Sequence, residues 1–208
     1  MTTLFDYWRS SASYRVRIAL ALCGDEWSTE IVNLVEGAQG APEHLARNPQ
    51  GYVPALAIDE VTLTQSLAII EYLDETRSLG LLPSSAIDRA RVRAIAHAVA
   101  MDIHPICNLN VAKYAVQASG SAIETKDWMQ HFISKGLRAV EQMVGDNGYC
   151  FGTRVTLADL CLMPQIYNAE RWGVDMHAMP KLTSIAANLA AHPAFVAAHP
   201  DNCASAPQ

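Results

Sequence analysis

The sequence predicts two domains, a small α/β domain over residues 1–82 and a larger all-α domain over residues 88–208. Three observations lead to this division. The first eighty residues alternate between strand-like and helix-like patterns, and the strand signal disappears after the segment 82–85. Half of the 208 residues are apolar and only 17% are charged, which supplies enough apolar side chains for buried cores.

The composition excludes several classes of protein. The net charge is −6 and no cluster of Lys and Arg occurs, which argues against nucleic-acid binding. Charge or Pro interrupts the apolar stretches well before membrane-spanning length, and no secretion signal opens the chain. The five cysteines are scattered without a CxxC pair, which is typical of reduced thiols. We therefore expect a cytoplasmic protein.

The first domain begins with a strand and a helix. A short strand over residues 3–8 is followed by good N-cap residues at positions 10–13. The helix continues over residues 14–23, and Gly24 can terminate it. Residues 27–33 alternate polar and β-branched side chains, which predicts a second strand.

The rest of this domain continues the alternation. Residues 42–47 predict a short helix with Pro in its first turn, and residues 54–64 predict a β-hairpin. A further helix begins at residues 65–66. The order is therefore βαβαββα. Parallel strands joined through helices require right-handed crossovers, so this order predicts a mixed four-stranded sheet.

The second domain shows only helical patterns. Residues 86–118 are helix-forming almost throughout, and residues 123–144 predict another long helix. Thr156 and Asp159 begin an apolar helix with the spacing of a capping box, which makes Asp159 a structural acceptor. Residues 180–191 predict a last helix before a Pro-rich tail.

Polar residues precede two of the predicted helices. Ser10, Ser11 and Ser13 lie between the end of a strand and the start of a helix. Either they cap the helix, or the free N–H groups of its N-terminus hold an anion or a thiolate. Gln65 and Ser66 pose the same alternatives, a cap or a seat for a carboxylate.

Two further features have both a structural and a binding interpretation. Pro54 at the start of a strand is ordinary, but a cis Val53–Pro54 bond would direct the Val53 backbone toward a peptide-like ligand. Arg9 and Arg171 are either solvated surface groups or, if they converge, a clamp for a dicarboxylate.

A polar segment falls inside the predicted helix 86–118. Asp102 and His104 do not form a metal site there, because side chains at i and i+2 do not share a helix face. Pro105 can bend the helix and leave carbonyl groups open. His104 is either a packed histidine or a catalytic one, and Asn108, one turn later, can face the same cleft.

Five segments, taken together, carry a family resemblance. They are SSASYRVRIAL at 10–20, NPQGYVPAL at 48–56, QSLAIIEYL at 65–73, DIHPI followed by NL at 102–109, and VTLAD followed by PQ and NA at 155–169. In this order they resemble the zeta class of glutathione transferases, better known as maleylacetoacetate isomerases, with bacterial maleylpyruvate isomerases as close relatives. The first and fourth segments are specific to the class, and the resemblance spans nearly the whole chain.

The resemblance implies a thioredoxin-like domain followed by an all-α domain, and a homodimer with reduced glutathione as its cofactor. The implied activity is cis–trans isomerisation of maleylacetoacetate or maleylpyruvate, without a metal. Two alternatives remain: a transferase that conjugates or dehalogenates small electrophiles such as α-halo acids, and a non-catalytic protein of the same fold.

The resemblance also implies roles for residues of the first domain. Ser10 would hydrogen-bond to the glutathione sulfur. Gln50 and Val53 would hold the tripeptide backbone, and Gln65 and Ser66 the γ-glutamyl carboxylate.

The remaining implied residues surround that site. The additional catalytic residues, beside the sulfur or at the carboxylates of the substrate, are Ser11, Arg9 and Arg171. The additional cofactor contacts, near the glutathione cleft, are Asp102, His104 and Asn108.

Two positions depart from relatives. Ala12 replaces the usual Cys, which argues against a mechanism that needs that protein thiol. Asn110 stands where some maleylpyruvate-isomerising relatives carry Arg, which favours a maleylacetoacetate-type substrate. The isomerisation itself needs only the glutathione thiolate, which adds to the cis double bond and leaves again after rotation. A helix N-terminus and the Ser10 hydroxyl would stabilise that thiolate.

Overall fold

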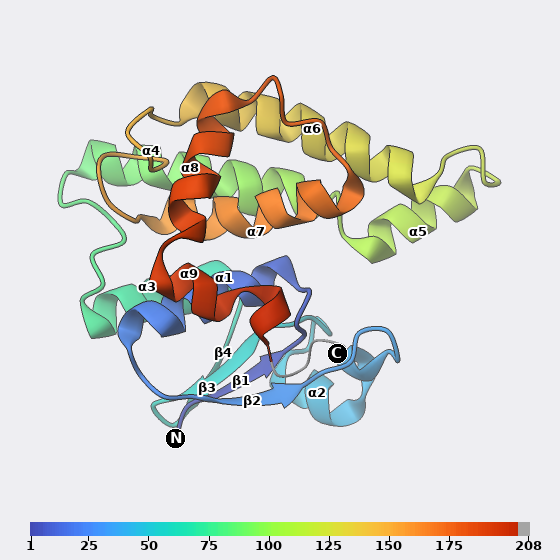
Figure 1. Cartoon of the computed structure of the whole chain (residues 1–208). Coiled ribbons are helices and arrows are strands. Elements are labelled where there is room, and N and C mark those ends of the chain that lie inside the picture. The colour runs from blue at the N-terminus through green and yellow to red at the C-terminus, as the bar shows by residue number, and fades with distance from the viewer. Residues whose placement is uncertain (204–208) are drawn as a thin grey trace. The chain divides into compact units, whose positions relative to one another are not determined.

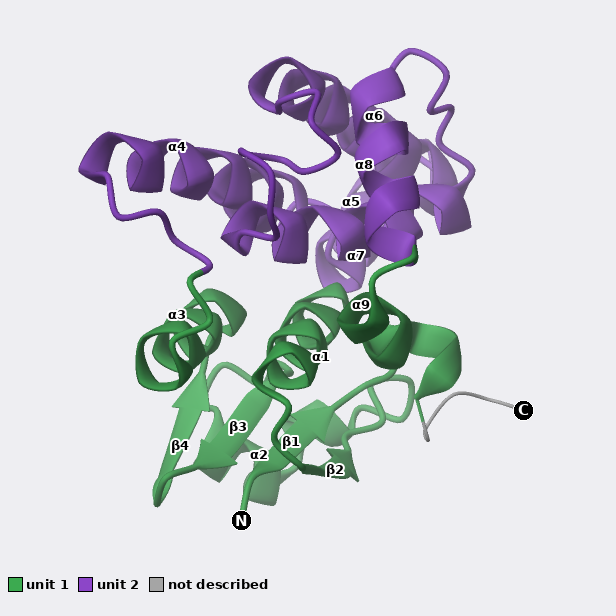
Figure 2. Cartoon of the chain, turned by 60° about the vertical axis from the view of Figure 1, so that its left-hand side comes forward, with its two compact units in different colours: residues 1–80, 191–208 green, residues 81–190 purple. Residues whose placement is uncertain are grey.

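The computed structural model describes residues 1–203, which divide into two units (Figure 2). The first unit comprises residues 1–80 together with the chain from residue 191, and the second comprises residues 81–190. The sequence-based boundaries assign everything after residue 88 to the second domain. The last five residues of that expected domain, 204–208, lie outside the described residues.

The first unit contains the predicted order βαβαββα. Its elements, each within a few residues of the expected bounds, are β1 (Thr3–Asp6), α1 (Ser11–Cys23), β2 (Ser28–Ile31), α2 (Pro42–Arg47), β3 (Ala55–Ile58), β4 (Val61–Thr64) and α3 (Ser66–Arg77). A short 3₁₀ turn, η1 (Ala38–Gly40), precedes α2. Gly24 ends α1 with φ of 73°, a left-handed conformation that costs glycine little.

The sheet is mixed and four-stranded, as predicted, with the order β2-β1-β3-β4. β1 pairs with β2 in parallel and with β3 antiparallel, and β3 and β4 form the hairpin. Helices α1 and α3 pack against each other on one face of this sheet (Figure 1). Their fully buried apolar side chains include Leu20, Ile69 and Leu73, so α1 is fixed on both its sheet and its helix side.

A helix that the sequence interpretation missed completes the first unit. The expected Pro-rich tail contains α9 (Pro193–Ala198), in which Pro193 occupies the first turn and His192 Nδ1 accepts a hydrogen bond from Ala194 N at 3.2 Å. Helix α9 packs on α1, and the Tyr14 hydroxyl donates to the Phe195 carbonyl at 3.4 Å. This packing places the described residues after 190 in the first unit.

The second unit is entirely helical. Its elements are α4 (Ala86–His97), the π-helical η2 (Ala98–Ile103), α5 (Leu109–Ala118), α6 (Thr125–Met143), α7 (Leu157–Trp172) and α8 (Pro180–Ala190). The expectation of one helix over 86–118 is wrong. The helix is interrupted between η2 and α5, because Pro105 has no N–H to donate to a helical hydrogen bond. Asn108 then caps the new helix by accepting a hydrogen bond from Asn110 N at 2.9 Å.

Asp159 has the structural role that the sequence predicts. Its buried carboxylate accepts hydrogen bonds of 2.8 Å from Thr156 N, Thr156 Oγ1 and Cys150 N, which forms the capping box at the start of α7. Burial raises the pKa of this carboxyl, and the three hydrogen bonds act against that rise. Between residues 1 and 203, no helix combines the length and the apolar character needed to cross a bilayer.

Gly136 allows α6 to approach η2 closely. A Cβ built on Gly136 would lie 2.6 Å from Ile103 Cδ1 and closer still to Ile103 Cγ1, and Ile103 is buried. Since η2 carries Asp102 and leads to His104, this contact also fixes the backbone of two candidate site residues.

We predict that Gly136→Ala lowers the free energy of unfolding by about 1–3 kcal/mol, because the clash with Ile103 outweighs the higher helix propensity of Ala. Urea unfolding measures the change. Gly40→Ala is the matched control, because a Cβ at Gly40 meets nothing within 4 Å. A Gly136→Ala variant as stable as the wild type would show that η2 and α6 are not closely packed there.

Candidate functional site

The turn between β1 and α1 places Ser10 at the N-terminus of α1. Ser10 is the N-cap residue, and its Oγ accepts a hydrogen bond from Ser13 N at 3.2 Å. The capping interpretation is therefore correct. It does not exclude binding, because a hydroxyl that accepts through its oxygen still has a proton to donate. The first turn of α1 carries no acidic residue, so no carboxylate of that turn competes with an anion for the positive end of the helix dipole.

Arg9 is held by the two aromatic residues that precede it. Its guanidinium lies 4.9 Å from the centroid of the Trp8 ring, and its Nη2 donates to the Tyr7 hydroxyl at 3.4 Å. Stacking and a hydrogen bond restrict a long side chain that would otherwise be mobile. Arg9 is thus oriented next to Ser10 in the chain, although its role toward a substrate stays a prediction.

The loop that carries Gln50 and Val53 is braced by two buried side chains. The Tyr52 carbonyl accepts hydrogen bonds of 2.9 Å from His44 Nε2 and from Asn48 Nδ2. Asn48 Oδ1 in turn accepts from Gln50 N at 3.1 Å. The Val53–Pro54 bond that follows is cis.

Sequence reasoning missed the bracing roles of His44 and Asn48. His44 occupies the predicted short helix 42–47, and Asn48 stands in the NPQGYVPAL segment, but neither position indicates a shared acceptor. Both side chains are only 2% exposed, so their hydrogen-bonding groups depend on protein partners.

At the start of α3, Gln65 adopts an unusual backbone conformation. Its φ is +68°, a region that costs a residue with a side chain about 1–3 kcal/mol and that is found most often at functional sites. Gln65 Nε2 donates to Gln50 Oε1 at 2.6 Å. Gln50 and Gln65 come from separate segments of the sequence, and the family resemblance assigns both to glutathione. The structure joins their side chains by a hydrogen bond.

A buried cation lies beside Ser66. Arg15, only 2% exposed, donates from Nη1 to Ser66 Oγ at 3.3 Å. Because α3 also has no acidic residue in its first turn, positive charge and free N–H groups gather where the sequence predicts a carboxylate seat. The sequence interpretation also missed Arg15 as part of this site. Its position among the apolar residues of helix 14–23 does indicate a buried cation that needs a polar partner.

Four candidates belong to the second unit. Asp102 is exposed within η2, and His104 is partly buried directly after it. Asn108 uses its side-chain oxygen to cap α5. The helix is interrupted between His104 and Asn108, so the one-turn spacing no longer argues for a shared face. Arg171 is exposed near the end of α7, and its guanidinium lies 5.0 Å from the Trp172 ring centroid.

Burial makes four of the protein's five thiols poor nucleophiles near neutral pH. The five cysteines are all outside disulfide bonds, and burial raises the pKa of Cys23 and of Cys107 to about 11. Burial also raises the pKa of Cys150 and of Cys203. At α1 the residue after Ser11 is Ala12, so no protein thiol stands in that first turn. A sulfur nucleophile at this helix would have to come from a ligand.

We predict that Cys23 alkylation by iodoacetamide is slow near pH 7 and rises about tenfold per pH unit without a plateau below about pH 10. The reason is that desolvation, aided by Asp25, keeps the thiol protonated until the pH approaches its pKa of about 11. Mass spectrometry of the alkylated peptides measures the rate. A plateau near pH 8 would contradict the raised pKa.

Comparisons with known proteins identify the domain family of each part of the chain. Residues 1–75 match the model of the glutathione S-transferase N-terminal domain, and residues 102–200 match that of the glutathione S-transferase C-terminal domain. A maleylacetoacetate isomerase of Rhizobium meliloti (strain 1021) is 57% identical over 205 residues, which cover 96% of each chain.

Two solved structures are similar over almost the whole chain. The holo structure of a bacterial maleylpyruvate isomerase, described as a zeta-class glutathione S-transferase, has a TM-score of 0.93 at 36% identity and covers 99% of this chain and 100% of its own. A maleylacetoacetate isomerase from Methylobacterium extorquens AM1, solved with malonate and glutathione, has a TM-score of 0.92 at 36% identity with the same coverage.

Proposed function

We propose, from the premise that this chain belongs to the glutathione S-transferase family, that it is a glutathione-dependent isomerase of maleylacetoacetate. The reaction converts the cis maleyl group to the trans fumaryl group. The observation that carries the proposal is the high identity to a maleylacetoacetate isomerase along nearly the full length of both chains. Asn110 favours maleylacetoacetate over maleylpyruvate, and the assay below compares the two substrates.

The residues of the first unit fit reduced glutathione by their chemistry. The tripeptide carries carboxylates, a peptide backbone and a thiol. Gln65, Ser66 and the Arg15 cation beside Ser66 suit a carboxylate, and the Gln50 amide, joined to Gln65 by a hydrogen bond, suits polar groups of the backbone. The Val53 backbone would pair with the peptide, and the N-terminus of α1 would receive the sulfur.

Bound glutathione supplies a sulfur nucleophile whose reversible addition to the maleyl double bond permits rotation. A free thiol has a pKa of about 8.5, so Ser10 has to favour the thiolate by donating its hydroxyl proton toward the sulfur. Each unit by which the pKa falls corresponds to about 1.4 kcal/mol. Arg9, oriented by Trp8 and Tyr7, would stabilise negative charge that develops on the carbonyl oxygen of the substrate.

Other assignments complete the proposal. Ser11 would support Ser10, and Arg171 would bind a substrate carboxylate. The proposed further contacts to glutathione are Asp102, His104 and Asn108.

We also propose a cytoplasmic homodimer. The position of all five cysteines outside disulfide bonds supports a reducing compartment. Large apolar side chains exposed in the second unit support association, and they include Ile87, Met101, Leu109 and Tyr114.

We expect the wild-type protein to convert maleylacetoacetate to the fumaryl isomer with a catalytic amount of glutathione and no loss of free thiol. An ultraviolet time course, paired with a thiol assay, measures both, and maleylpyruvate should react more slowly. No turnover by a folded protein that binds glutathione would contradict the proposal. Thiol loss with α-halo acids would then indicate conjugation instead.

Ser10→Ala should lower kcat/KM about a hundredfold, because one hydrogen bond to the developing sulfur anion is lost. The free energy of unfolding of Ser10→Ala should fall by only about 1 kcal/mol, the usual cost of losing an N-cap side chain. Ser10→Thr keeps both the hydroxyl and the cap and should retain most of the activity. Equal activities of wild type and Ser10→Ala would refute the role of this hydroxyl.

A further inference from the structure

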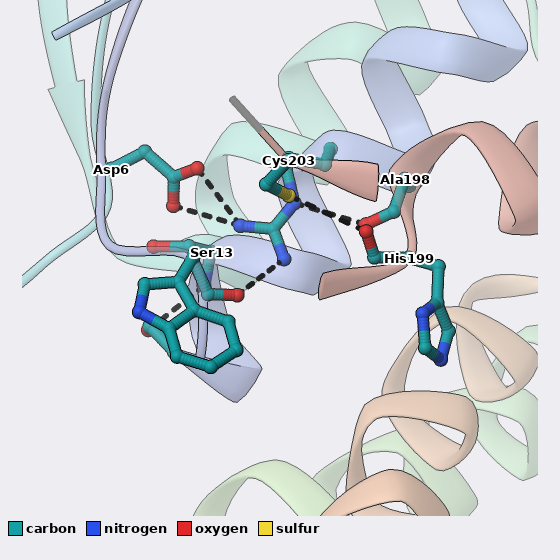
Figure 3. A network of polar contacts seen from close by, with 8 residues as sticks. Asp6, Ser13, Ala198, His199 and Cys203 are labelled. Carbon is teal, nitrogen blue, oxygen red and sulfur yellow. Dashed lines mark hydrogen bonds and ion pairs between the residues drawn. The ribbon is translucent and has the colours of Figure 1, made fainter. Parts of the chain in front are cut away.

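The buried guanidinium of Arg17 donates hydrogen bonds to three residues of the first unit, and Figure 3 labels two of these acceptors, Asp6 and Ala198. Its Nη1 donates to both carboxylate oxygens of Asp6, at 2.9 and 2.8 Å, and both side chains are almost fully buried. Asp6 is the last residue of β1, and Arg17 lies in the middle of α1. This ion pair therefore connects the strand to the helix across the turn that carries Ser10.

The other donors of Arg17 reach backbone carbonyls. Nη2 donates to the Trp8 carbonyl at 2.9 Å, and Nε donates to the Ala198 carbonyl at 3.0 Å. One planar group thus binds the end of β1, the turn itself and the end of α9. Because the donors of a guanidinium have fixed directions, these acceptors cannot shift independently of one another.

We propose that Arg17 is the positioning residue for Arg9 and Ser10, an inference that rests on the proposed function. The Trp8 carbonyl that Arg17 holds belongs to the peptide bond that leads into Arg9. On the other side of the turn, Ser10 N donates to the Tyr7 carbonyl at 2.8 Å. The turn is therefore fixed at its middle by Arg17 and at its end by the helix cap.

Stability alone does not account for this arrangement. Replacing a buried ion pair by apolar side chains of similar volume is often neutral or stabilising, so the pair is not needed for burial as such. An apolar pair could fill the same volume between β1 and α1, but it could not donate to the Trp8 carbonyl. The guanidinium fixes the position and orientation of the backbone that carries Arg9 and Ser10. This matters because a small displacement of a catalytic group can lower the rate about a hundredfold.

Arg17→Lys tests the proposal, because an ammonium keeps the charge opposite Asp6 but cannot reach the three acceptors in the same geometry. In the protein without ligand, we expect amide hydrogen exchange of Ser10 and Ser13 to accelerate about tenfold. With glutathione, titration of thiolate absorbance should give a thiol pKa raised by about one unit, or about tenfold less thiolate near neutral pH. The value of kcat should fall while KM for glutathione changes little.

Tyr14→Phe is the matched control. It removes another hydrogen bond between α1 and α9, from the Tyr14 hydroxyl to the Phe195 carbonyl, without touching the turn. Exchange at Ser10 and the thiol pKa should stay at wild-type values in this variant. If Tyr14→Phe reproduced the effects of Arg17→Lys, Arg17 would act only by docking α9, and the proposal would be overturned.

A second variant covers a failure of Arg17→Lys to fold. The double variant Asp6→Leu/Arg17→Met removes both charges together, so neither is left buried alone, and it lacks the donor to the Trp8 carbonyl. It should fold and show the same faster exchange and raised thiol pKa. Wild-type exchange and thiol pKa in either folded variant would contradict the proposal. If the wild-type protein bound glutathione without lowering the pKa of the glutathione thiol, the proposed function would be contradicted instead. Amide hydrogen exchange of Ser10 and Ser13 in the ligand-free protein would still test the role of Arg17.

Discussion

The first unit depends on satisfying one buried cation. Once Arg17 is enclosed between the sheet, α1 and α9, leaving any of its donors unpaired would cost about 1–3 kcal/mol, and a charge costs more. Asp6 supplies the opposite charge, while Trp8 and Ala198 supply carbonyl oxygens from two further segments. The same guanidinium therefore holds the backbone of the turn after β1 and the end of α9.

The N-termini of α1 and α3 share features that favour anions. The first turns of α1 and α3 carry no acidic side chain. Ser10 is the N-cap of α1, and Ser66 is the first residue of α3, where Arg15 adds a buried positive charge. In a protein with a net charge of −6, these two helix N-termini are thus locally positive. Under the proposed function, the thiolate and the carboxylate of glutathione would each be stabilised by a helix N-terminus.

Local patterns explain what could be predicted from the sequence. The βαβαββα order, the four-stranded sheet and the capping box of Asp159 follow from periodicity and from residues close in sequence. Helix α9 was missed because it is only six residues long, so its stability depends on the burial of Phe195 against the rest of the unit. The cap residues His192 and Pro193 do not show this burial. The interruption before Asn108 depends on Pro105 and on the π-helical turn together. Arg15 and Arg17 bond to partners far away in sequence, Ser66 and Ala198, which only the tertiary fold supplies. His44 and Asn48 bond within their own segment, but a local pattern does not show that both would bond to the Tyr52 carbonyl.

In the proposed mode of binding, the N-terminus of α1 receives the glutathione sulfur and the start of α3 receives a carboxylate. A crystal structure of the protein with reduced glutathione tests this directly. We predict the sulfur within hydrogen-bonding distance of Ser10 Oγ and the γ-glutamyl carboxylate at Ser66. A tripeptide bound in the opposite direction, or a sulfur remote from Ser10, would contradict the account.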